Sequence, residues 1–114
     1  MSARSEKFIS VGDRDVKVLF TNRALAEAEG RLGKTVLQLA TEFEKGAAGM
    51  SEIAILLRSG MEAARRDDRA GGQPVTLNDA YDVLDEVGFV QVATVVMTAL
   101  AEVLSFGTGE NQKN

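Results

Sequence analysis

Residues 28–35 read Ala-Glu-Gly-Arg-Leu-Gly-Lys-Thr, which is the spacing of a loose phosphate-binding loop. Such a loop cradles phosphates with backbone N–H groups and reaches the outer phosphate with a lysine, here Lys34. It must follow a buried strand, whereas the residues before this stretch have a helical pattern. Gly33 is therefore interpreted as the end of one helix and Thr35 as the N-cap of the next.

A group of acidic side chains, Asp79, Asp82, Asp85 and Glu86, is the nearest approach to a cation site. Their spacing places them opposite the apolar stripe of one helix, so they should face water. Calcium would need a loop of alternating oxygen ligands with a glycine bend, and the sequence has none. We therefore predict a solvated acidic face and no metal site.

Four arginines, Arg58, Arg65, Arg66 and Arg69, form a basic edge near the end of a predicted helix. Positive charge there complements the helix dipole. Two neighbouring aspartates dilute it, and the chain as a whole carries a net charge of −4. A nucleic-acid-binding protein normally has a strongly basic face, so no nucleic-acid partner is predicted.

The composition excludes several common kinds of catalytic site. The 114 residues include no His and no Cys, which removes thiolate chemistry, the Ser-His-Asp triad and the usual zinc sites. The strong Ser and Thr candidates lie at helix starts, where capping explains them. We therefore predict no enzymatic activity, no cofactor and no small-molecule substrate.

The elements that carry these residues are a hairpin and five helices. Val16, Val18 and Phe20 alternate with other residues in a strand pattern, and the Gly-Asp-Arg-Asp stretch at residues 12–15 supplies a turn. Apolar residues at helical spacing, together with caps, then predict the helices. The predicted ranges are residues 7–20 for the hairpin and residues 22–32, 35–45, 51–67, 76–87 and 89–106 for the helices.

The predicted fold class is mainly α, with the N-terminal β-hairpin followed by a compact bundle of about five helices. Residues 7–106 form one domain, preceded by a flexible N-terminus (residues 1–6) and followed by a disordered tail (residues 107–114). Gly60 lies inside the apolar stripe of the third helix, so another helix should approach closely there. The polar start and the interrupted apolar run at the end predict a cytoplasmic protein without membrane contact.

The last predicted helix is apolar over most of its circumference. Its polar side chains form one narrow stripe. The favoured interpretation is a central core helix; otherwise the flank of Val95, Ala99 and Phe106 is an exposed patch that binds a partner. Ile55, which points away from the apolar stripe of its own helix, is a further candidate contact.

Three stretches resemble a known family: residues 18–33 (Val-Leu-Phe-Thr-Asn-Arg-Ala-Leu-Ala-Glu-Ala-Glu-Gly-Arg-Leu-Gly), residues 53–64, and residues 76–88 (Thr-Leu-Asn-Asp-Ala-Tyr-Asp-Val-Leu-Asp-Glu-Val-Gly). They resemble the small tail assembly chaperones of long-tailed phages, closest to the type in gene transfer agents and prophage tail modules, sometimes labelled tail tube protein. The resemblance implies a cytoplasmic protein of the bacterial host that binds the tape-measure protein and tail tube subunits and is absent from the mature particle.

Two alternative functions remain open at this point. One is a structural tail tube or tail completion subunit retained in the particle, with self-association through the hairpin Phe8–Phe20. The other, ranked lower, is a helix-turn-helix DNA-binding regulator that uses the region around residues 79–88. Its acidic side chains would repel DNA phosphates.

Overall fold

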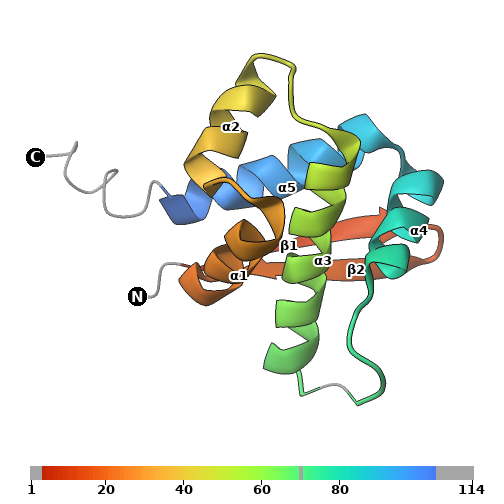
Figure 1. Cartoon of the computed structure of the whole chain (residues 1–114). Helices are drawn as coiled ribbons and strands as arrows, with labels where there is room; N and C mark the ends of the chain where they lie inside the picture. The colour runs from red at the N-terminus through yellow and green to blue at the C-terminus, as the bar shows by residue number, and fades with distance from the viewer. Residues whose placement is uncertain (1–3, 70, 105–114) are drawn as a thin grey trace, which may run out of the picture.

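The structure is a computed structural model that describes residues 4–69 and 71–104. These residues form two strands and five helices: β1 (Ser5–Val11), β2 (Arg14–Phe20), α1 (Asn22–Leu32), α2 (Val36–Glu44), α3 (Met50–Asp67), α4 (Leu77–Val87) and α5 (Phe89–Leu104). The predicted fold class is therefore confirmed (Figure 1). Phe106 and the predicted tail 107–114 lie outside the described residues.

The hairpin begins earlier than the sequence predicted. β1 and β2 pair antiparallel, with Ser5 opposite Phe20, and Gly12 makes the turn with a φ of 64°. The interpretation of residues 1–6 as flexible is wrong at Ser5 and Glu6, which belong to β1. Ser5 Oγ donates to Glu102 Oε1 at 2.7 Å, and Lys17 Nζ forms an ion pair with Glu6 Oε2 at 2.7 Å. These contacts extend the strand.

Helix α3 crosses the hairpin and organises the core (Figure 1). It packs against β2, α1, α4 and α5, while α5 packs mainly against β1. Val18, Phe20, Ile53 and Leu57 are all fully buried where these elements meet. The hairpin therefore does not stand alone in water, because its apolar face is covered by helices.

Local capping explains most helix boundaries. The Thr21 side chain accepts a hydrogen bond from Ala24 N, and Thr35 caps α2 in the same way. Gly33 ends α1 in the left-handed region with a φ of 72°, as predicted. Helix α3 instead begins at Met50 with Gly49 as its N-cap, one residue before the predicted start.

Helix α5 is a core helix, as the favoured interpretation predicted. Its inward residues are buried, and Val92, Val96 and Leu100 are fully inaccessible to solvent. Within the described residues, no single helix has the length and apolar character needed to cross a bilayer. Helices α4 and α5 reach that length only together, across a bend of 119°.

Candidate functional site

The residues predicted to form a partner surface do not form one patch. Val95 and Ile55 are half-buried, and Phe106 lies outside the described residues. Ala99 is fully buried, so the expectation that it lies on an exposed flank of α5 is wrong. The physical reason is that α5 packs against β1, β2, α3 and α4, and Ala99 belongs to the central apolar cluster.

The open face of α5 is its predicted polar stripe, and a groove lies beside it. This α2–α5 groove has a volume of about 350 Å³. Its wall is formed by Ala40, Phe43 and Glu44 of α2 with Thr94, Met97, Thr98 and Ala101 of α5. The solvent-accessible surface of the groove consists mostly of carbon atoms, so the groove suits an apolar partner segment.

Two large apolar side chains extend the faces that form this groove. Leu37 is 64% exposed and precedes Ala40 by three residues, so both lie on one face of α2. Val90 is 76% exposed and precedes Thr94 by four residues on α5. Sequence reasoning missed this surface; its available signal was Leu37, which lies outside the apolar stripe of its helix.

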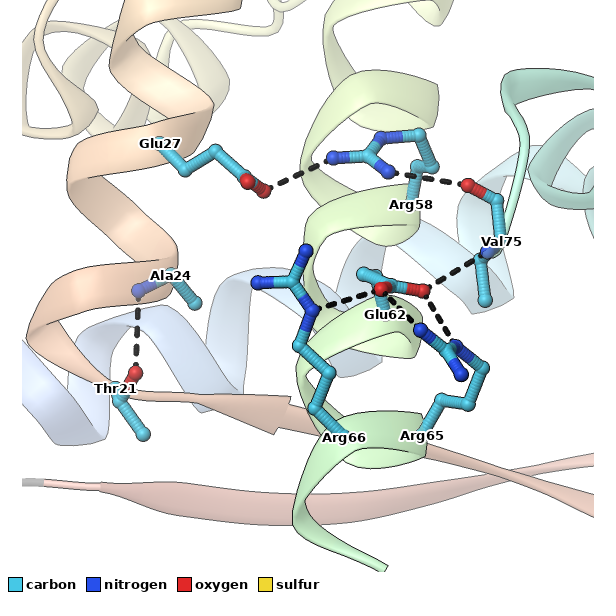
Figure 2. Close-up of polar contacts among 8 residues, drawn as sticks. All are labelled: Thr21, Ala24, Glu27, Arg58, Glu62, Arg65, Arg66 and Val75. Carbon is cyan, nitrogen blue, oxygen red and sulfur yellow. Dashed lines mark hydrogen bonds and ion pairs between the residues drawn. The ribbon is translucent and has the colours of Figure 1, made fainter. Parts of the chain in front are cut away.

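A second notable feature is a buried charge on α3. Glu62 is only 2% exposed. Its carboxylate accepts four hydrogen bonds: from Arg65 Nε at 2.9 Å and Nη2 at 2.8 Å, from Arg66 Nε at 2.8 Å and from Val75 N at 2.9 Å (Figure 2). The hydrogen bonds from Arg65, followed by those from Val75 and Arg66, lower the pKa of Glu62 to about 2 in spite of its burial.

Arg58 lies one turn before Glu62 on α3 and completes this network. It is 8% exposed, and its Nη2 donates to Glu27 Oε1 of α1 at 2.9 Å. Its Nη1 donates to the Val75 carbonyl at 3.1 Å. Both polar backbone atoms of Val75 are thus held by α3, one by Glu62 and one by Arg58 (Figure 2). The network therefore fixes the chain just before α4.

The four arginines predicted to form a basic edge do not all lie on an exposed edge. Arg58 is not an edge residue, and Arg65 and Arg66 both bind the same buried carboxylate. Sequence reasoning missed Glu62 because a glutamate in a helix is usually exposed. An available signal was the pair of arginines three and four residues after it.

A pocket of about 290 Å³ adjoins the network, between the start of α1 and the second half of α3. We call it the α1–α3 pocket. Its wall comprises Leu19, Thr21, Arg23, Ala24, Glu27, Ser59, Glu62, Ala63, Arg66 and Asp67. Unlike the α2–α5 groove, this pocket is lined largely by polar and charged side chains.

The loose phosphate-loop motif folds as the capping interpretation predicted. Gly33 and Thr35 act at helix ends, and Lys34 forms ion pairs with Glu42 and Glu52. The hydrogen bonds that Lys34 Nζ donates, first to Glu42 and then to Glu52, raise the pKa of Lys34. The lysine is therefore occupied by carboxylates that join α2 to α3.

The acidic side chains of α4 are exposed, as predicted: Asp79, Asp82, Asp85 and Glu86. Over residues 4–69 and 71–104, no group of three or more acidic side chains is placed to hold a metal ion. Asp79 has a local role, because its Oδ2 accepts a hydrogen bond from Thr76 N at 2.9 Å in the cap of α4.

Comparison with known proteins identified no relative: no protein-family model, curated protein or solved structure matches this chain. The features that bear on function are therefore the groove, the pocket and the buried network.

Proposed function

We propose that this chain is a non-enzymatic tail assembly chaperone of a phage-like particle, which binds the tape-measure protein through the α2–α5 groove. The observation that carries the proposal is that groove, with exposed Leu37 and Val90 on the helix faces that form it. The resemblance of residues 18–33, 53–64 and 76–88 to tail assembly chaperones supplies the partner. Recruitment of tail tube subunits would be a second task of the same complex.

The α2–α5 groove is suited to bind one helix of the tape-measure protein. A tape-measure protein is a long helical chain whose apolar faces aggregate when they are uncovered. An amphipathic helix buries its apolar ridge in a groove between two helices of its partner. Residues with short side chains, Ala40, Thr94, Thr98 and Ala101, leave room for that ridge.

Charge adds to the effect of burial. Glu44 lies at the wall of the groove and is exposed, so it favours a basic residue beside the apolar ridge of the incoming helix. The net charge of −4 would also help to keep a complex in solution, because like-charged complexes repel one another. We place this activity in the cytoplasm of the bacterial host, before the particle is complete.

The test is co-expression of the tagged chain with the large protein encoded just downstream, followed by size exclusion and mass spectrometry. The double variant Thr98→Glu with Ala101→Glu puts two charges into the groove at exposed positions. We expect the native chain to hold the large protein in solution and the double variant to lose it while keeping its helical circular dichroism.

The matched control is Asn78→Glu with Ala26→Glu, which adds the same charge at exposed positions on α4 and α1, outside the groove. It should bind as the native chain does. Equal binding by both double variants would show that the α2–α5 groove is not the contact surface. Absence of any complex with the native chain would contradict the chaperone function itself.

The alternative of a structural tail subunit is favoured by one observation. Within the described residues β1 and β2 pair only with each other, and Phe8 is 57% exposed on the hairpin. Unpaired strand edges are templates for pairing between copies. If the purified chain forms rings or tubes that Phe8→Lys abolishes, the structural function replaces the chaperone function.

A further inference from the structure

The α1–α3 pocket contains a buried hydroxyl that the fold does not use. Ser59 is 1% exposed and lies in the wall of the pocket. Its Oγ has no hydrogen-bond partner among the described residues. Burying a hydroxyl without a hydrogen-bond partner destabilises the fold. A ligand atom that accepted a hydrogen bond from Ser59 Oγ would remove this cost and would itself be stabilised there.

The same pocket receives the N-terminal turn of α1. Thr21, Arg23 and Ala24 line it, and the Thr21 side chain accepts the hydrogen bond from Ala24 N at 3.1 Å. The N–H groups of Asn22 and Arg23 have no acceptor within the helix. The start of an 11-residue helix also carries a partial positive charge, which attracts anions.

The carboxylates of the pocket already have arginine partners. Glu27 pairs with Arg58, and Asp67 Oδ2 lies 3.0 Å from Arg4 Nη2. The oxygens of Glu62 are saturated by the hydrogen bonds described above.

The remaining hydrogen-bonding capacity of the pocket consists mainly of donors. Arg66 uses Nε for Glu62, and its two terminal nitrogens have no partner among the described residues. Its guanidinium lies between α3 and α1, on the side of Ala24 and Glu27 (Figure 2). Arg23 adds a second exposed guanidinium at the wall.

We propose that the α1–α3 pocket binds a carboxylate group, held by Arg23, Arg66, the Ser59 hydroxyl and the start of α1. The planar fork of an arginine matches a carboxylate, and the ligand's two oxygens can accept several donors at once. A phosphate fits less well, because its second negative charge would face the carboxylates of Glu27, Glu62 and Asp67. The carboxylate belongs either to a free small acid or to an acidic side chain of a bound protein.

The test is a titration of ¹⁵N-labelled full-length chain by NMR at constant ionic strength set with sodium chloride. The probes are sodium acetate, a blocked Gly-Glu-Gly tripeptide and inorganic phosphate. We expect acetate to shift the amides of Arg23, Ala24 and Ser59 saturably and phosphate to bind more weakly. Tripeptide binding about tenfold tighter than acetate would assign the site to a protein side chain, and equal or weaker binding to a free acid.

The variants separate this site from general charge effects. Arg23→Gln combined with Ser59→Ala should weaken acetate binding by about tenfold or more, as expected for loss of charge-assisted hydrogen bonds. Arg31→Gln, at the other end of α1, is the matched control and should bind as the native chain does. Shifts that do not saturate, tighter binding of phosphate, or native affinity in the double variant would overturn the proposal.

Discussion

Gly60 of α3 lies so close to Phe20 of β2 that a Cβ atom on residue 60 would lie 2.8 Å from the Cε1 atom of the ring. It would also overlap Cγ1 of Val18, so the element that approaches Gly60 is strand β2 and not the helix that the sequence predicted. Both neighbours are fully buried, so neither can move aside without disturbing the core. We predict that Gly60→Ala destabilises the chain by about 1–3 kcal/mol, as overpacked core variants do. Urea unfolding measures this difference.

The control for this prediction is a glycine in open space. A Cβ atom on Gly30 of α1 would meet nothing within 4 Å. Gly30→Ala should therefore stabilise the chain by about 0.5–1 kcal/mol, because alanine favours the helix and restricts the unfolded chain. A Gly60→Ala variant as stable as Gly30→Ala would contradict the close packing of α3 on β2.

Glu62 predicts a specific dependence of stability on pH. Its pKa in the folded chain is about 2, below the ordinary value of 4.5. The unfolded chain therefore binds this proton more readily, and the stabilisation is complete above pH 4.5 and lost as the pH falls toward 2. We predict that Glu62→Gln lowers the free energy of unfolding at pH 7 by about 3 kcal/mol. The free energy of unfolding of this variant should also fall less than that of the native chain as the pH falls from 4.5 toward 2. We call this fall the acid limb of the stability curve.

The measurement is the urea midpoint at a series of pH values between 2 and 7. Asp82→Asn, at an exposed position on α4, removes the same charge and should keep the native acid limb. An unchanged limb in Glu62→Gln would mean that other carboxylates govern the acid sensitivity.

The sequence predicted those parts of the fold that depend on neighbouring residues. The sequence predicts Thr35 as a cap because the group that it bonds, Gln38 N, lies three residues ahead. The strand position of Ser5, opposite Phe20, was missed because the side chain of Ser5 is held by Glu102, which is 97 residues away in the sequence. The start of α3 was placed late, since the Glu52 side chain bonds Gly49 N and not a residue further on.

The candidate sites were harder to predict for the same reason. The α2–α5 groove depends on how two helices from different parts of the chain sit beside each other. Arg58 reaches Glu27 across 31 residues, and Glu62 reaches Val75 across 13. Periodicity shows which face of a helix is apolar, but it does not show which charged residue is buried by a partner from another helix.

The cap of α4 gives a local prediction. Thr76 Oγ1 accepts a hydrogen bond from Asp79 N at 3.1 Å, and Thr76 N in turn donates one to Asp79 Oδ2. Thr76→Ala should lower the free energy of unfolding by about 1 kcal/mol. Thr41→Ala is the control, because among the described residues the Thr41 hydroxyl donates only to Leu37 O within α2; its effect should stay within about 0.5 kcal/mol. Thermal unfolding of both variants decides whether the cap contributes.

The last prediction concerns the pair formed by Arg58 and Glu27. Arg58 is buried and bonds both Glu27 and the Val75 carbonyl, whereas the Glu27 side chain is 38% exposed. We predict that Arg58→Ala costs about 3 kcal/mol, because the Val75 carbonyl loses its partner as well. Glu27→Ala should cost about 1 kcal/mol or less, because solvent screens its charge.

A double-mutant cycle on Arg58 and Glu27 measures the energy of the pair itself, which we expect to be about 0.5–1 kcal/mol. Since Arg58 also anchors Val75, hydrogen exchange at the Val75 amide should accelerate in Arg58→Ala and much less in Glu27→Ala. The Leu57 amide, inside α3, serves as the internal reference for global unfolding. If both single variants released Val75 equally, after correction for that reference, the ion pair and not the carbonyl contact would be what holds the chain in front of α4.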